Sequence, residues 1–195
     1  MMRGIFLCCF WLIVANVCRA QSAAQQARVK EIREMYNAAM QQIQKDTEQP
    51  EYTDNSLYLV MNRMQPGAGM QHYYVDMYIK DCGQPENEVQ DWRPYFFRVK
   101  YNIAARQFVD EYLVDAAQGT PVFIFSRFPD EEEVYETRVY FKADGGFCYA
   151  TQTVKDKDGG QTVKELDEEH EDVRSLTVGS SAIYEWSSYT MNGVY

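Results

Sequence analysis

The sequence is 195 residues long and has a formal net charge of −10, with 29 acidic against 19 basic residues. An acidic chain lacks the clustered Lys and Arg that displace counterions from nucleic acid, and anionic lipid repels it, so both classes of partner are disfavoured. The aromatic content of 14% argues against disorder, because such side chains bring large areas to bury, and the length fits one domain.

Residues 1–20 have the features of a secretory signal peptide. A positive charge precedes an apolar run over 4–17, and the segment closes with small residues, so cleavage is expected between Ala20 and Gln21. The run is shorter than the roughly 20 apolar residues of a membrane span, so no integral span is expected in the mature chain. Cleavage also removes Arg3 and Arg19, so the formal net charge of the mature chain is −12. We expect a periplasmic or extracellular protein with one domain over 21–195.

Two cysteines, Cys82 and Cys148, remain after this cleavage. Disulfides persist in oxidising compartments, so an exported chain with two cysteines leaves two possibilities open, one disulfide or two unpaired thiols. A lipid-modified Cys18 is a further, weaker alternative, because Val17 is not the small residue expected before such a cysteine.

Residues 22–48 are predicted to form one amphipathic helix. Apolar side chains recur there at steps of three and four, and the helix ends before Pro50. The stripe consists of Val29, Ile32, Tyr36, Ala39 and Ile43. We expect it to pack against the core of the domain.

From about Ser56 the apolar period changes to two, which is typical of half-buried strands. About seven candidate strands are separated by turn residues, and Asp144-Gly145 is a strong hairpin signal. The candidates are 57–64, 71–80, 95–103, 108–114, 121–128, 134–142 and 147–154. Because no crossover helix lies between them, they should form an antiparallel meander over 56–155.

The C-terminal segment 161–195 is less regular. Residues 161–172 are compatible with the end of a strand or a solvated helix, and the second half of 173–191 with a helix or packed coil. The predicted fold is therefore α+β: an N-terminal amphipathic helix packed on a twisted antiparallel meander sheet, with the C-terminal segment packed nearby.

Both faces of this sheet carry apolar side chains. The N-terminal helix is expected on the face of Met77, Phe97 and Val139, yet the opposite face is also aromatic. That second set comprises Tyr74, Tyr78, Phe96, Val122, Ile124, Phe128, Tyr140 and Tyr149. So large an apolar surface should be covered. The candidate covers are the C-terminal segment around Trp186, closure of the sheet on itself, a partner chain, or an apolar ligand.

Local signatures of catalysis and metal binding are weak. The sequence has no His-Glu-x-x-His, Gly-x-Ser-x-Gly or Cys-x-x-Cys motif, and neither His72 nor His170 lies in one. The segment 156–160 is better explained as a hairpin turn than as a calcium loop, because Val154 would occupy the first ligand position. We predict no catalytic residue, no metal site and no cofactor.

Carboxyl groups are abundant, among them Asp110, Glu111 and Asp115, but acid–base chemistry needs two at a set separation. The leading hypothesis is an exported, non-catalytic binding or interaction module of the cell envelope, whose partner is a small apolar ligand or an envelope protein. The alternatives are a secreted hydrolase that uses acidic residues and a structural protein that dimerises through a sheet face.

Overall fold

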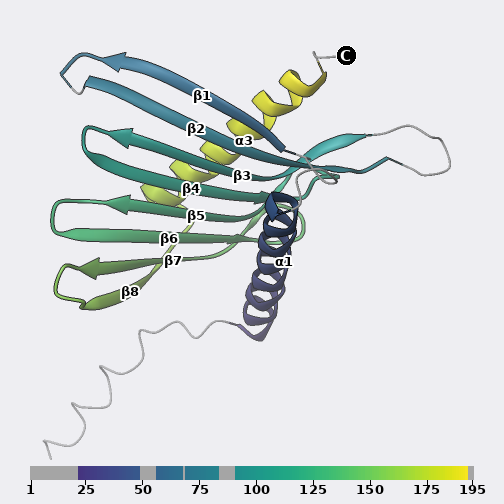
Figure 1. The fold of residues 1–195 in the computed structure, drawn as a ribbon. Helices are drawn as coiled ribbons and strands as arrows, with labels where there is room; N and C mark the ends of the chain where they lie inside the picture. The colour runs from purple at the N-terminus through teal and green to yellow at the C-terminus, as the bar shows by residue number, and fades with distance from the viewer. Residues whose placement is uncertain (1–21, 49–55, 68, 84–90, 193–195) are drawn as a thin grey trace, which may run out of the picture.

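The computed structural model describes residues 22–48, 56–67, 69–83 and 91–192 (Figure 1), so the expected signal peptide and its cleavage site lie outside the described residues. One antiparallel sheet of eight strands, in chain order, lies between a helix at each end of the described chain. The elements are α1 (Ala23–Glu48), β1 (Ser56–Gln65), β2 (Gly69–Asp81), β3 (Trp92–Ile103), β4 (Arg106–Val114), β5 (Pro121–Pro129), β6 (Glu133–Phe141), β7 (Phe147–Asp156), β8 (Gln161–Leu166) and α3 (Glu171–Asn192).

The α+β prediction is confirmed, and the seven candidate strands correspond to β1–β7. The Asp144-Gly145 hairpin is present between β6 and β7, with Gly145 at a positive φ of 82°. The number of strands is eight because Gln161–Leu166 pairs with β7. Five of its six residues are exposed, so β8 lacks the apolar alternation that marked the other strands.

Helix α1 begins with a capping box. The Ser22 Oγ accepts a hydrogen bond from the Gln25 backbone N–H at 3.2 Å, and the Gln25 side chain accepts one from the Ser22 N–H at 2.9 Å. The helix then crosses the sheet. Gln25 donates to the Cys148 backbone carbonyl of β7 at 3.1 Å, and Arg28 donates to the Phe141 carbonyl of β6 at 2.9 Å. These bonds join residues more than a hundred positions apart.

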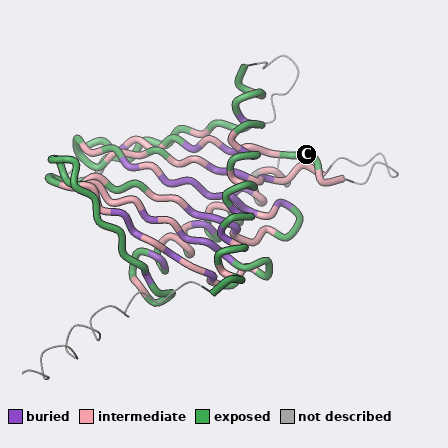
Figure 2. Tube along the Cα trace, turned by 90° about the horizontal axis from the view of Figure 1, so that it is seen from below, coloured by how far each residue is buried: buried purple, intermediate pink, exposed green. Residues whose placement is uncertain are grey.

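The two helices cover opposite faces of the sheet (Figures 1 and 2). The predicted stripe of α1, including the fully buried Ile32, packs against Phe96, Leu113 and Tyr140. On the other face, Val173 of α3 belongs to a cluster with Phe97 and other side chains of β2–β8. The core is therefore built in two layers, one on each side of the sheet.

The expected facing of α1 is wrong. It packs on the face of Phe96 and Tyr140, whereas Met77, Phe97 and Val139 lie beneath α3. Because both faces are apolar, alternation located the strands without showing which helix covers which face. The C-terminal segment does cover one face, although Trp186 is itself 42% exposed.

Three β-bulges account for further errors of facing. Each of β3, β5 and β7 carries one extra residue with no partner in the pairing: Tyr95, Val122 and Cys148, respectively. All three side chains pack in the cluster beneath α1. Beyond such a residue the alternation reverses, which is why Tyr95 and Phe97 lie in different clusters, although residues two apart in a regular strand share one face.

Candidate functional site

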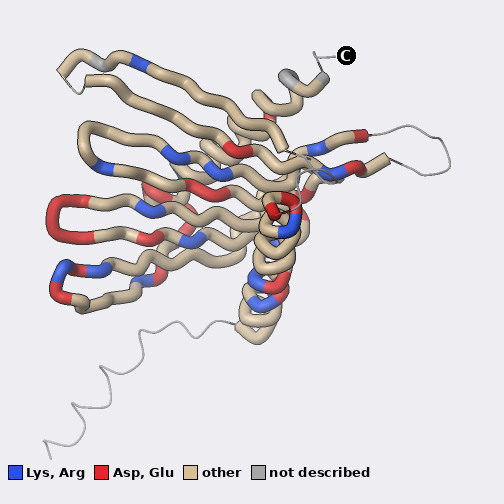
Figure 3. Tube along the Cα trace, in the orientation of Figure 1, with Lys and Arg blue, Asp and Glu red and all other residues tan. Residues whose placement is uncertain are grey.

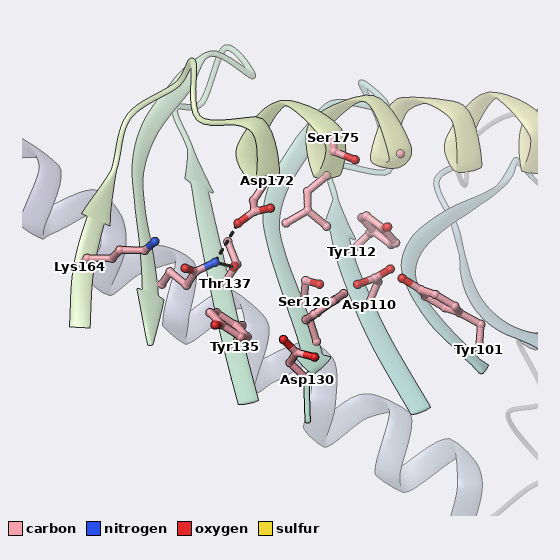
Figure 4. Close-up of a pocket in the computed structure, with 14 residues that line it drawn as sticks. Tyr101, Asp110, Tyr112, Ser126, Asp130, Tyr135, Thr137, Lys164, Asp172 and Ser175 are labelled. Atoms are coloured by element: carbon pink, nitrogen blue, oxygen red, sulfur yellow. Dashed lines mark hydrogen bonds between the residues drawn. The ribbon is translucent and has the colours of Figure 1, made fainter. Parts of the chain in front are cut away.

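The candidate site is a pocket between α3 and the sheet (Figure 4). Its volume is about 630 Å³, within the range of small-molecule sites. Side chains of six consecutive strands and of the first half of α3 line it, and they combine carboxyl, hydroxyl and aromatic groups. They are Tyr101, Asp110, Tyr112, Ser126, Phe128, Asp130, Tyr135, Thr137, Gln152, Lys164, Asp172, Ser175, Leu176 and Gly179.

Asp110 of β4 is the buried carboxyl group of this pocket, with 7% of its surface exposed. The hydroxyl groups of Ser126, Tyr101 and Tyr112 line the same pocket and favour its ionised form. Burial outweighs them and raises the pKa of Asp110 above the usual aspartate value. Among the residues that the structure describes, no Lys, Arg or His is an ion-pair partner of this carboxyl group.

Gln152 of β7 is a second buried polar side chain of the pocket. Its Nε2 donates to the Thr137 hydroxyl at 3.1 Å and to the Asp172 carboxylate of α3 at 2.8 Å (Figure 4). Gln152 is 4% exposed, so these bonds fix its orientation. They also tie the start of α3 to the sheet beside the pocket.

Aromatic side chains form one wall of the pocket. Five rings cross β2 to β6 in a row, with centroid separations of 5.4, 4.9, 5.1 and 6.0 Å. In order they are Tyr73, Tyr101, Phe108, Phe128 and Tyr135, of which Tyr101, Phe128 and Tyr135 line the pocket. Phe128 is 45% exposed, which is unusual for an aromatic side chain within a sheet and gives the pocket an accessible apolar surface.

The rim of the pocket includes the charged connection between β5 and β6 (Figure 3). Asp130 at this rim pairs with Arg106 at 2.9 Å, so its charge is already compensated. The Tyr135 hydroxyl donates to Glu133. Lys164 lines the pocket from β8, four strands away from Asp110 on β4.

The opposite face of the sheet has a different buried carboxylate, Glu111. It accepts hydrogen bonds from Arg98 of β3 at 2.7 Å and from the Tyr36 hydroxyl of α1 at 2.5 Å. All three groups are partnered within the protein. Successive residues of β4, Asp110 and Glu111, thus point to opposite faces, one into a pocket and the other into a structural ion pair.

The two histidines are far apart in the topology and neither lines this pocket. His72 of β2 contacts Asn62 of the edge strand, with its Nδ1 2.6 Å from the Asn62 Oδ1. His170 lies just before α3, where its Nδ1 accepts the Asp172 backbone N–H at 3.3 Å. Both have roles in local structure.

The cysteines are free thiols in this structure. Cys82 follows β2 and is half-buried, Cys148 is buried in β7, and four strands separate β2 from β7. At a spacing of about 4.8 Å per strand, their backbones are far beyond the roughly 7 Å that a disulfide spans. The disulfide that the sequence left possible is not formed. Burial raises the pKa of the Cys148 thiol, as expected for a structural cysteine.

The turn over 156–160 satisfies its own polar groups. The Asp156 carboxylate accepts the backbone N–H groups of Asp158 and Gly160 at 2.9 and 2.8 Å. Asp115 likewise accepts those of Ala117 and Gln118 in the turn before β5. Within the described ranges, no group of three or more His, Cys, Asp or Glu side chains is placed to hold a metal ion.

The hydrolase alternative requires two carboxyl groups beside aromatic side chains, and Asp110 and Asp172 do share the pocket. The two differ in their surroundings: the Asp172 carboxylate of α3 accepts a hydrogen bond from the Gln152 Nε2 at 2.8 Å, whereas burial raises the pKa of Asp110 on β4.

Sequence reasoning named Asp110 only as one of many carboxyl groups. The signal that identifies it is local: it lies midway between Phe108 and Tyr112, at a position of β4 that alternation assigns to an apolar face. A charged side chain at such a position calls for a partner or a function.

No helix of the described chain has both the length and the apolar character needed to cross a membrane. Comparison with known protein families, curated proteins and solved structures yields no match to this chain.

Proposed function

We propose that this protein is an exported, non-catalytic binding module and that its ligand occupies the pocket between α3 and the sheet. The observation that carries the proposal is a cavity of about 630 Å³ with a buried carboxyl group, Asp110, that the fold itself does not pair with a cation. Burying such a group costs folding free energy, and proteins retain that cost mainly where the group serves a function.

The nature of the lining refines what the sequence suggested. An apolar ligand was expected, yet Asp110, Gln152 and Asp172 place polar atoms beside the exposed ring of Phe128. A ligand with both an apolar part and a polar part suits this combination, because small-molecule sites use apolar walls for affinity and a few polar groups for orientation.

The experiment is native mass spectrometry of the protein isolated from its own cells without unfolding. Ser175 lines the pocket from α3, so Ser175→Trp should fill it, whereas Val178 on the same helix is 69% exposed and Val178→Trp serves as the matched control. We expect a small-molecule adduct on the wild type and on Val178→Trp, and none on Ser175→Trp. A bare wild-type mass, or an adduct that Ser175→Trp retains, contradicts the proposal.

Export is tested separately, by sequencing the N-terminus of the protein recovered outside the cytoplasm. Cleavage at the expected site gives Gln21 as the first residue. An intact Met1 in the cytoplasmic fraction would remove export from the proposal without affecting the pocket.

A second candidate function is association of two copies through β1. This edge strand has ten residues and exposes apolar side chains on both sheet faces, including Leu57 and Met61 on one and Tyr58 and Val60 on the other. Its only charged residue is Arg63. Long apolar edges favour strand pairing with another chain.

The test compares the two edges of the sheet. In Val60→Lys a charge enters β1, and in Val163→Lys the same change is made in β8, where Val163 is 61% exposed. We expect the wild type and Val163→Lys to sediment at twice the mass of one chain at high concentration, and Val60→Lys at the mass of one chain. A monomeric wild type contradicts this candidate.

A further inference from the structure

The Asp110 carboxyl group shares the pocket with the hydroxyl groups of Ser126, Tyr101 and Tyr112, which favour its ionised form. A hydroxyl that donates to a carboxylate keeps only acceptor lone pairs to offer a ligand. The region around Asp110 therefore presents acceptors to anything that enters the pocket.

The neighbouring groups follow the same pattern. The Nε2 of Gln152 donates to both Thr137 and Asp172, which leaves its Oε1 to accept. The Tyr135 hydroxyl donates to Glu133 outside the pocket. A pocket that combines a buried carboxyl group with such acceptors is complementary to a donor that carries positive charge.

We propose that the ligand is a small molecule with a primary ammonium group, which ion-pairs with Asp110 while the apolar part of the ligand lies against Phe128. This inference rests on the proposed binding function and specifies its ligand class. An ammonium group has three N–H donors and no acceptor, so it matches the free acceptors of the site. It also supplies the cation that the buried carboxylate lacks.

Two further observations support this assignment. Burial disfavours the ionised form of Asp110, and a cation bound beside it favours that form. The one lysine that lines the pocket, Lys164, belongs to β8 and is separated from Asp110 by four strand spacings, each about 4.8 Å. Its ammonium group does not substitute for that of the ligand.

The experiment uses a matched pair of probes, 2-phenylethylamine and 2-phenylethanol, which differ only in the ammonium or hydroxyl group. Dissociation constants are measured by NMR titration of the intact protein at pH 7. We expect the amine to bind at least about tenfold more tightly, as a charge-assisted hydrogen bond of about 1.5–3 kcal/mol predicts. Lowering the pH should weaken amine binding as Asp110 becomes protonated, and leave alcohol binding unchanged.

The variants are Asp110→Asn and, as the matched control, Asp76→Asn on the other sheet face, where Asp76 is 4.0 Å from Lys100. Asp110→Asn should abolish the preference for the amine, and Asp76→Asn should preserve it. The wild-type pH titration tests the inference even if Asp110→Asn fails to fold.

The outcomes separate the ligand class from the proposed function. Equal affinity for the two probes, or an amine preference that survives Asp110→Asn or low pH, overturns the ammonium assignment. Failure of both probes to bind overturns it as well. In each case the binding function stands if Ser175→Trp still removes the adduct seen by native mass spectrometry, and falls if it does not.

Discussion

The hydroxyl group of Tyr36 is predicted to stabilise the docking of α1 on the sheet. It donates to the Glu111 carboxylate at 2.5 Å, while Arg98 donates to the other carboxylate oxygen at 2.7 Å. The Glu111 side chain is 9% exposed, so water cannot replace a lost donor. The ring of Tyr36 also packs on Phe96 and Phe123, with centroid separations of 6.1 and 5.3 Å. Tyr36→Phe keeps that ring contact and removes the hydroxyl alone.

The expected cost follows from the partner's charge and burial. A hydrogen bond to a charged group contributes about 1.5–3 kcal/mol, and a buried acceptor left without it retains its desolvation penalty. We therefore expect Tyr36→Phe to lower the free energy of unfolding by about 2 kcal/mol. For a chain of this size the melting temperature should fall by about 4–8 °C.

The assay is urea unfolding followed by far-UV circular dichroism, with the slope against urea checked for constancy. Tyr149→Phe is the matched control, because the Tyr149 hydroxyl donates to Glu165 at 3.2 Å in an exposed position. The control should change stability by less than about 0.5 kcal/mol. If Tyr36→Phe costs no more than Tyr149→Phe, the assignment of Glu111 as a buried acceptor that depends on α1 is refuted.

Three other changes have defined outcomes. Asp110→Asn should raise the free energy of unfolding at neutral pH by about 1 kcal/mol. Burial raises the pKa of Asp110 in the folded protein, so between the unfolded and folded pKa values the folded state binds more protons than the unfolded state. The free energy of unfolding of the wild type should therefore fall as the pH rises through that window. Urea titrations of Asp110→Asn at the same pH values should lack this fall. Gly119→Ala should cost at least about 1–2 kcal/mol in the same assay, because Gly119 has a φ of +71° and its new Cβ would lie 2.4 Å from the Tyr184 ring. In thiol labelling of the native protein, Cys82 should react well before Cys148, whose pKa burial raises; equal rates would contradict the buried placement.

Much of the fold could be predicted because strand formation here follows local patterns. Alternation from Leu57 to Val154 and turn residues such as Asp144-Gly145 mark seven strands, and the lack of crossover helices implies the meander. The eighth strand could not be predicted from the sequence, because its exposed residues have no apolar alternation and its pairing with β7 is a tertiary contact.

The facing of the sheet could not be predicted, for two physical reasons. Both faces are apolar, so the sequence does not distinguish the side of α1 from that of α3. The extra residues Tyr95, Val122 and Cys148 then shift the alternation at one end of three strands. The pocket depends on that facing, since it sets Asp110 beneath α3 and Glu111 towards α1.

The path of α1 across the sheet has a consequence for the order of folding. Each hairpin of the meander joins neighbours in the chain, so its strands meet through short loops and the entropy of closing them is small. The helix that is synthesised first instead finds its partners, such as the Cys148 carbonyl bound by Gln25, on strands that are made late. Until those strands arrive, the apolar stripe around Ile32 has no surface to cover it, which makes the incomplete chain a natural client for chaperones.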